Sequence, residues 1–316
     1  MFFYADTAND LVRDRADKLT GRTCFLAKQM KKYKSAVGTV TCNSSAYIQE
    51  WCCFQYISGF EKIVICLDDC TDDTYDKITC LPSHVLERVD IAFIDSEPRG
   101  HGFQFRGMSQ MYRAYRDQVD WFAFFDDDEY LYDHKRRTVN EVIDTLDGEN
   151  VSQLHLAWLV YGNNRQMLSA PPTETRINWF TRRREFNNVQ IVKSISKLDH
   201  IDEKRDKKNS WCFVHSNAVT GLSLTLDGTV VSEHQQQAVV SVKTQYFDTC
   251  LVHYRHGAME DYVIRYKIWQ GHNRKDSGVP SFEGFIKTTE KNNACEDRRM
   301  SIYAAELIDL LAQCRK

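Results

Sequence analysis

The chain has 316 residues, of which 42% are hydrophobic and 27% are charged, and its formal net charge is −3. This composition is ordinary for a globular protein, and the length allows one large α/β domain or two smaller ones. A net charge this small gives no general attraction to nucleic acid or to a membrane surface. No stretch approaches the roughly 20 apolar residues of a membrane-spanning helix. We therefore expect no nucleic-acid partner and no transmembrane segment.

The cysteine pattern and the N-terminus bear on the compartment. The 11 cysteines include Cys52, Cys53 and Cys66, which fall inside apparent helices or strands, where a buried thiol behaves as a small hydrophobe. There is no CxxC pair and no zinc-ligand spacing. The first residues lack the basic and apolar regions of a secretion signal. A cytoplasmic protein with reduced cysteines is the prediction, and a catalytic domain cut from a secreted parent is the alternative.

Strand and helix patterns alternate along the first half of the chain. Residues 1–36 are charged and weakly periodic, and we predict a helical N-terminal extension there. Thr138 and Glu141 form a capping box at the start of one helix. The expected strands are 37–41, 62–67, 89–94, 121–125 and 153–160, and the helices between them are 45–58, the segment around 108–115, and 138–146. This βαβ alternation predicts a mostly parallel sheet with flanking helices.

The pattern is less regular after residue 161, where long polar connections separate the elements. Further strands are expected at 189–195, 210–215 and 249–254, and helices at 259–271 and 299–314. We find no internal repeat, so one domain with helical extensions at both ends is the simplest interpretation.

The stretch WFAFFDDDEYLY, residues 121–132, joins an apolar run directly to four carboxylates. The first five residues fit a buried strand, and a solvated acidic turn is the simplest explanation of the carboxylates. However, Asp126 and Asp128 would lie at the carboxyl end of a parallel strand, as would Asp68 and Asp69 two strands earlier, and ligands bind at that edge. Carboxylate oxygens at Asp-x-Asp spacing suit Mg²⁺ or Mn²⁺. We therefore favour a metal site.

Several segments together resemble one enzyme family. AYIQEWCCFQYISGFEKIVICLDDCTDDT and DWFAFFDDDEYL resemble the first part of glycosyltransferase family 2 and family 92 (DUF23-like) proteins, which have a GT-A fold. LAWLVYGNNRQ, IVKSI and LVHYRHGAMEDYVIRYKIWQG resemble later segments of the same proteins, in the same order. The resemblance implies a GT-A domain over 37–271, with a nucleotide-binding half at about 37–135 and an acceptor half at about 136–271. Residues 272–316 would form a C-terminal helical extension.

Two positions depart from the family pattern. The family has Lys-Asn-Glu after its first strand, where this chain has Cys42, Asn43 and Ser44 preceded by Thr41. Asp69 stands where the family has asparagine. Neither departure affects the Asp-x-Asp sequence.

The resemblance implies a metal-dependent transferase that uses a nucleotide sugar, in particular a UDP-sugar, with Mn²⁺ or Mg²⁺. Asp68 or Asp69 would bind the nucleoside. Asp126 would bind the ribose and the metal, and Asp128 and His253 would complete the metal site. A core histidine is the alternative for His253. The acceptor would be a hydroxyl of a glycan or glycoconjugate, and inversion at the anomeric carbon is expected.

Other assignments follow from the residues. Inversion needs a base for the acceptor hydroxyl, and Glu174 or Asp199 is the candidate. Trp158 is a candidate for stacking on an acceptor sugar, with core packing as the alternative. Arg99 and Arg106 follow the third strand and are candidates for binding the diphosphate or donor sugar.

Two further functions remain open at this stage. Clustered aspartates on a sheet also build the two-metal sites of phosphohydrolases and nucleases. A catalytically silent module that only binds sugar nucleotides is the other alternative, because the acid of the Lys-Asn-Glu segment is missing.

Overall fold

The structure, a computed structural model, contains one unit, Lys31–Lys316, that holds every described residue. Of the predicted N-terminal extension, residues 1–30 lie outside the described residues, and Tyr33–Thr41 already forms the first strand. The described residues are 31–94, 103–146, 148, 150–186, 189–202, 213–231, 239–241, 248–271 and 281–314.

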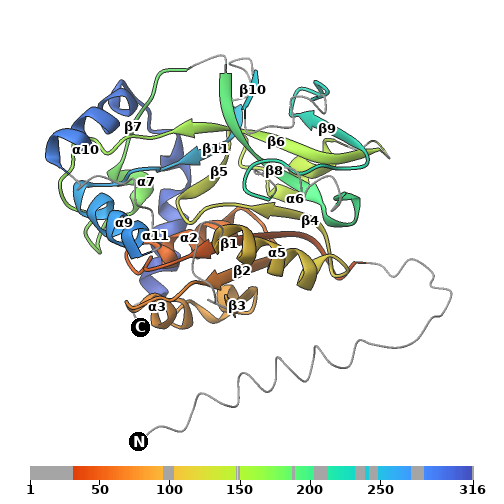
Figure 1. Ribbon diagram of the computed structural model, residues 1–316, viewed down its shortest axis with the longest axis horizontal. Helices are drawn as coiled ribbons and strands as arrows, with labels where there is room; N and C mark the ends of the chain where they lie inside the picture. Colours follow the sequence, from red (N-terminus) through yellow and green to blue (C-terminus); the bar gives the residue numbers. More distant parts are fainter. Residues whose placement is uncertain are drawn as a thin grey trace, which may run out of the picture. The chain divides into compact units, whose positions relative to one another are not determined.

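A single sheet runs through the described residues in the order β3–β2–β1–β4–β8–β6–β11–β5, with β9 beside β6 and β10 beside β8 (Figure 1). A short second ribbon pairs β7 with β12. The strands are β1 (Tyr33–Thr41), β2 (Lys62–Leu67), β3 (Val89–Phe93), β4 (Val119–Phe124), β5 (Glu129–Asp133), β6 (Val151–Val160), β7 (Arg182–Arg183), β8 (Val189–Lys197), β9 (Leu222–Thr225), β10 (Val239–Ser241), β11 (Thr249–His253) and β12 (Cys295–Glu296).

Strand direction divides the sheet into two parts. Strands β1 to β4 are all parallel, which confirms the βαβ interpretation of the first half of the chain. Strand β8 runs antiparallel to both β4 and β6, so β6 has the direction of β4 without touching it. Strand β11 is parallel to β6, and β5 closes the edge antiparallel to β11. The α/β class and a central sheet with flanking helices are therefore as expected.

Helices connect the strands and cover the sheet. The capping box predicted at Thr138 and Glu141 is present at the start of α6. No helix among the described residues is both long and apolar enough to span a bilayer. The helices are α2 (Ile48–Ile57), α3 (Thr74–Thr79), α4 (Ser83–Leu86), α5 (Phe103–Tyr115), α6 (Val139–Asp144), α7 (Arg176–Trp179), α9 (Met259–Gly271), α10 (Phe282–Thr289) and α11 (Ala304–Cys314), with 3₁₀ turns η2 (Leu198–His200), η5 (Glu290–Asn293) and η6 (Arg299–Tyr303).

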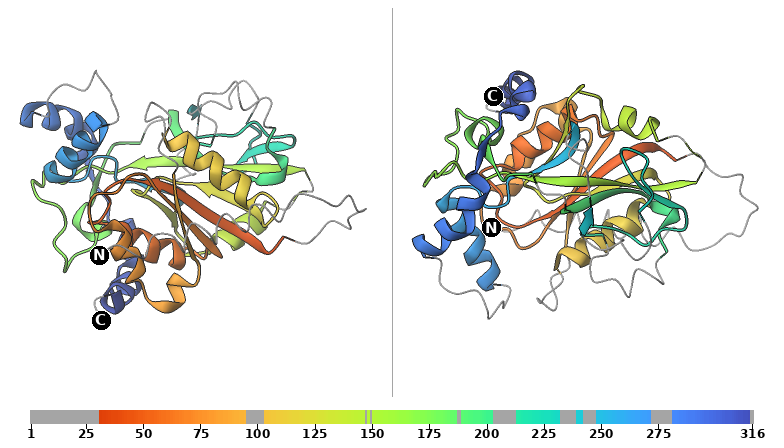
Figure 2. Two further views of the ribbon diagram at one scale, coloured as in Figure 1. Left: turned by 60° about the horizontal axis from the view of Figure 1, so that its bottom comes forward. Right: turned by 90° about the horizontal axis from the view of Figure 1, so that it is seen from above.

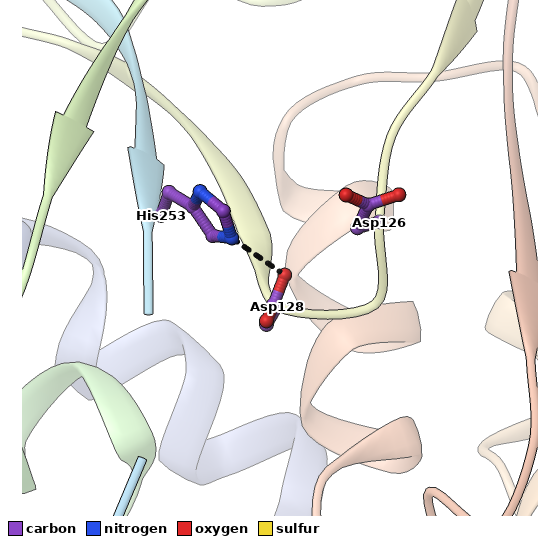
Figure 3. Close-up of side chains that lie close together, drawn as sticks. All are labelled: Asp126, Asp128 and His253. Carbon is purple, nitrogen blue, oxygen red and sulfur yellow. Dashed lines mark ion pairs between the residues drawn. The ribbon is translucent and has the colours of Figure 1, made fainter. Parts of the chain in front are cut away.

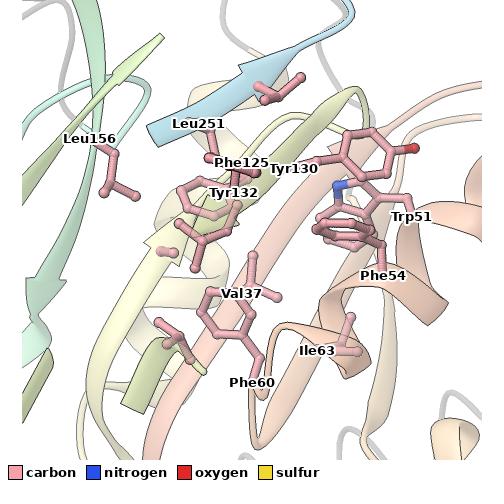
Figure 4. Close-up of a cluster of buried hydrophobic side chains, with 14 of the residues drawn as sticks. Val37, Trp51, Phe54, Phe60, Ile63, Phe125, Tyr130, Tyr132, Leu156 and Leu251 are labelled. Atoms are coloured by element: carbon pink, nitrogen blue, oxygen red, sulfur yellow. The ribbon is translucent and has the colours of Figure 1, made fainter. Parts of the chain in front are cut away.

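The two faces of the sheet have separate hydrophobic cores. Strand β4 shows why, because alternate side chains of a strand point to opposite faces. Trp121 and Ala123 pack in the core that includes α2 and α6, while Phe122 and Phe124 pack in the core that includes α5. Figure 4 shows part of the first core, and Figure 2 shows α2 and α5 on opposite sides of β1. With both faces covered, a polar ligand finds open access at the strand ends.

Two expectations need correction. The strand expected at 210–215 is wrong where the structure describes it: Phe213–His215 forms a turn, with Phe213 at φ +61°. Strand β5 was missed, although Tyr130, Leu131 and Tyr132 supply it. The reason is that its first residue, Glu129, looks like the end of a polar loop and is in fact buried.

Asp297 is one of several groups that attach the C-terminal segment, residues 281–314, to the acceptor half. Asp297 lies between two guanidinium groups: its Oδ2 is 2.5 Å from Arg183 Nε on β7 and 2.9 Å from Arg299 Nη2. Its backbone N–H donates to Thr181 O at 2.7 Å. Burial alone raises the pKa of Asp297, but the hydrogen bonds from Arg299 and Arg183 outweigh it and lower the pKa to about 2.

Replacing Asp297 by Asn should destabilise the fold in a pH-dependent way. Because the folded pKa lies below the unfolded one, the carboxylate stabilises the protein above about pH 4, and this is lost as the pH falls towards 2. We expect a loss of about 1 to 2 kcal/mol at pH 7 in urea unfolding. The exposed Asp309→Asn variant is the control. A stability difference that does not change between pH 7 and pH 3 would contradict this account.

Candidate functional site

The candidate site lies at the carboxyl end of β4, beside β1. The strand order reverses between β1 and β4, because β2 and β3 lie on one side of β1 and β4 lies on the other. In open α/β sheets the helices leave β1 and its neighbour in opposite directions there, and the crevice between them binds ligands. Residues 126–129, here called the acidic segment, follow β4 directly. The fold therefore places four carboxylates at a binding crevice.

Asp126, Asp128 and His253 converge at this place. One ligand atom from each lies within 4.8 Å of the others. His253 ends β11 and is paired in register with Glu129, which brings its ring to the acidic segment. Its Nε2 is 3.2 Å from Asp128 Oδ1, the contact marked in Figure 3. The structure thus brings together the three side chains that the sequence predicts as metal ligands.

The chemistry of the three groups fits a divalent cation. Asp128 is buried, and its Oδ1 faces His253 Nε2 at 3.2 Å. A carboxylate oxygen and an imidazole nitrogen are both ligand types that divalent cations accept. Asp126 is 27% exposed at its side chain, so the cluster is open to solvent on one side. Carboxylates with one imidazole suit Mn²⁺, and the carboxylates alone suit Mg²⁺.

The acidic segment is not a solvated turn. Glu129 is fully buried, and its Oε2 accepts the backbone N–H of Asp126 at 2.8 Å. Lys193 of β8, also fully buried, places Nζ 3.2 Å from Asp126 Oδ1 and 3.4 Å from Glu129 Oε2. Burial, with Asp126 and Asp128 nearby, raises the pKa of Glu129 well above its usual value. Burial lowers the pKa of Lys193, but these carboxylates outweigh it and keep the lysine charged.

Asp127 is held by the segment after β1. Its Oδ2 accepts hydrogen bonds from Thr41 Oγ1 at 2.5 Å and from Ser44 Oγ. Arg176 of α7 donates to the backbone O of Asp127 at 3.1 Å and lies over the Tyr47 ring. Ser44 therefore supplies a hydroxyl donor that helps to fix the acidic segment.

Asp128 is bound from two sides. His253 faces Oδ1, and Arg265 of α9 donates to Oδ2 from Nη2 at 2.6 Å. Burial alone would raise the pKa of Asp128, but the electrostatic interaction and hydrogen bond with His253, together with the charge of Arg265, more than offset this and hold its pKa well below the usual value. Asp128 is therefore a carboxylate, the form that binds metal.

The residues predicted to bind the nucleotide lie at the same edge of the sheet where they are described. Asp68 directly follows β2, is buried, and donates its N–H to Thr41 O at 2.9 Å. Asp69 follows in a left-handed conformation, at φ +45°, and is exposed. Arg106 lies in α5 and is half-buried. Gln104 of the same helix, which was not predicted, donates from Nε2 to Asp126 Oδ1 at 2.5 Å. Arg99 lies outside the described residues.

Trp158 lies behind the cluster. It is 7% exposed, and its ring centroid is 4.3 Å from that of His253 and 5.1 Å from that of His215. A side chain so enclosed favours the packing interpretation over stacking on an acceptor. Its contact with His253 gives it a positioning role for that ring.

The two candidate bases lie in different places. Glu174 is exposed and precedes Arg176 by two residues, so it belongs to the chain segment that reaches the acidic segment. Asp199 follows β8, whose Lys197 pairs with Trp121 at the start of β4. Asp126 lies five residues after Trp121, just beyond the end of β4, or about 16 Å away at 3.3 Å per residue. This placement argues against Asp199 and leaves Glu174 as the candidate.

Comparisons with known proteins add little to this geometry. No protein-family model matches the chain, and no curated protein matches its sequence. Among solved structures, the chain is similar to an active-site mutant of the glycosyltransferase LgtC. The two share 11% identity over 82% of this chain and 97% of that one, with a TM-score of 0.34. A similarity this weak carries no argument about function, so the proposals below rest on the site.

Replacing Lys193 by Met should destabilise the fold strongly. The change leaves Asp126 and Glu129 without the cation that both contact, and breaking a buried ion pair costs about 3 to 5 kcal/mol. We expect a melting temperature lower by about 5 to 10 °C in calorimetry. Lys197→Met, four residues along the same strand and half-buried, is the matched control and should change little. Equal effects of the two substitutions would refute the role given to Lys193.

Proposed function

We propose that this chain is a metal-dependent glycosyltransferase that takes a sugar from a nucleotide-sugar donor and transfers it to a hydroxyl of a glycan or glycoconjugate. The observation that supports this most is the convergence of Asp126, Asp128 and His253 at the turn in strand order, with an exposed side only at Asp126. A UDP-sugar as donor, inversion as the stereochemical outcome and a cytoplasmic location are finer predictions from the sequence.

The proposed chemistry explains why carboxylates gather here. The leaving nucleoside diphosphate gains negative charge in the transition state, and a bound divalent cation stabilises that charge as a Lewis acid. Asp126, Asp128 and His253 would hold the cation. Lys193 and Gln104 fix Asp126 through contacts at 3.2 and 2.5 Å, so its carboxylate is oriented before any ligand arrives.

The remaining roles follow the placement of the side chains. Asp68 and Asp69, at the end of the adjacent strand β2, are proposed to bind the nucleoside. Arg106 and Arg99 are proposed to bind the diphosphate or the donor sugar. Glu174 is proposed as the base that takes the proton of the acceptor hydroxyl, since it is exposed and near in sequence to Arg176.

The two alternatives differ in what they predict for an assay. A two-metal phosphohydrolase needs a second set of ligands, and the described residues contain one cluster of three such groups. It would release phosphate from nucleotides without an acceptor. A silent binding module would bind the donor without turnover. Incubation with a panel of nucleotide sugars, Mn²⁺ and a simple glycan acceptor separates the three, because only the transferase gives donor-dependent glycan extension.

Replacing Asp128 by Asn should strongly weaken metal-dependent nucleotide binding. The variant keeps the size of the side chain but removes the charge of a ligand. Because removing even an outer partner of a ligand costs 10- to 100-fold in metal affinity, we expect about a 100-fold loss of Mn²⁺ affinity with UDP present. Titration calorimetry measures it, with Asp117→Asn, 91% exposed at its side chain, as the control. Unchanged binding of UDP and Mn²⁺ by the Asp128 variant would rule out this site.

A further inference from the structure

The three cations around the acidic segment differ in how they are built into the fold. Lys193 is fully buried beneath Asp126 and Glu129, and Arg176 is buried between Tyr47 and Asp127. Arg265 is different, because its side chain is 31% exposed while its partner Asp128 is 3% exposed. Arg265 is therefore the cation that reaches the site from the solvent side.

Helix α9 carries Arg265 one turn after its firmly held first turn. Asp261, one turn before Arg265, accepts hydrogen bonds from Ala258 N at 2.7 Å, Ser169 Oγ at 2.6 Å and Tyr47 OH at 3.1 Å. Residues four apart lie on the same face of a helix. The anchoring of Asp261 thus directs Arg265 to Asp128, while the Arg265 side chain stays partly exposed and its Nη1 donates to Arg255 O.

Arg265 and a divalent cation would compete for the same carboxylate. Arg265 Nη2 is 2.6 Å from Asp128 Oδ2, and one carboxylate oxygen of the same residue belongs to the candidate metal cluster. A metal cation bound by Asp128 would have to share the negative charge of that carboxylate with the guanidinium. The guanidinium would also repel the metal cation, because arginine stays charged at any physiological pH. A cation on its own should therefore bind more weakly than its three ligands would otherwise allow.

A diphosphate removes this penalty. The planar guanidinium matches phosphate oxygens through paired hydrogen bonds, and the added negative charge offsets the two adjacent positive charges. We infer that Arg265 makes this site select a divalent cation together with a nucleoside diphosphate over the cation alone. This inference rests on the proposed function and names the residue that couples its two ligands.

The test measures how strongly the two ligands cooperate. Mn²⁺ affinity is determined by electron paramagnetic resonance and calorimetry, without and with saturating UDP, for wild type, Arg265→Gln and Arg265→Lys. The ratio of the two affinities is the coupling factor, and it must be equal for either order of binding. Arg255→Gln, which removes an equal charge from an exposed position ten residues earlier, is the matched control. Thermal melting confirms that each variant is folded.

For Arg265→Gln we expect Mn²⁺ alone to bind at least about tenfold more tightly, the low end of the value of a charged hydrogen bond. The coupling factor should fall by at least about tenfold, with Arg265→Lys in between and Arg255→Gln close to wild type. Unchanged or weaker binding of Mn²⁺ alone by Arg265→Gln, with UDP-dependent Mn²⁺ binding intact in wild type, overturns this inference but not the proposed function. Failure of wild type to bind Mn²⁺ with or without UDP overturns both.

Discussion

The electrostatic balance at the end of β4 is the constraint on which the rest of the structure depends. Four consecutive carboxylates follow a buried strand, and two such charges about 4 Å apart repel by about 4 kcal/mol at an effective dielectric of 20. The fold meets this cost with Lys193 from β8, Arg176 from α7 and Arg265 from α9. These cations come from the second half of the chain. The acidic segment can therefore adopt its buried conformation only when the parallel strands and the acceptor half are folded together.

The same electrostatic balance explains how the acidic segment can form a metal-binding site. Glu129 and Asp127 are satisfied within the protein, by Lys193 and by the hydroxyl groups after β1. Asp126 and Asp128 keep oxygens directed to His253 and to the solvent side, where a further cation fits. The acidic segment therefore divides into two members that hold the loop and two that are available to a ligand, and that division follows from the partners that each carboxylate meets rather than from residue type.

Much of the fold and part of the site could be predicted from sequence. Short apolar runs that alternate with helical patterns predicted the parallel strands, the Thr138–Glu141 capping box predicted α6, and Asp-x-Asp after a strand predicted two of the three clustered residues. The cations were missed because their role depends on tertiary contact: Lys193 lies within an apolar strand, and Arg265 reaches Asp128 across 137 positions of the chain. A charged residue inside an otherwise buried strand, as in IVKSI, was the one local signal. Trp158 illustrates a different limit. The sequence shows an aromatic residue in a strand but does not show whether its ring is buried or free to stack on a ligand, so acceptor stacking and core packing could not be separated.

Pulsed electron paramagnetic resonance of Mn²⁺ bound together with UDP tests the central claim most directly, because it reports the atoms next to the metal. The account predicts nitrogen coupling from one histidine and phosphorus coupling from the diphosphate in the same complex. The nitrogen signal should disappear in His253→Gln and persist in His215→Gln, since His215 packs on Trp158 outside the ligand set. Phosphorus coupling without any nitrogen coupling in wild type, or a nitrogen signal that survives in His253→Gln, would contradict the account.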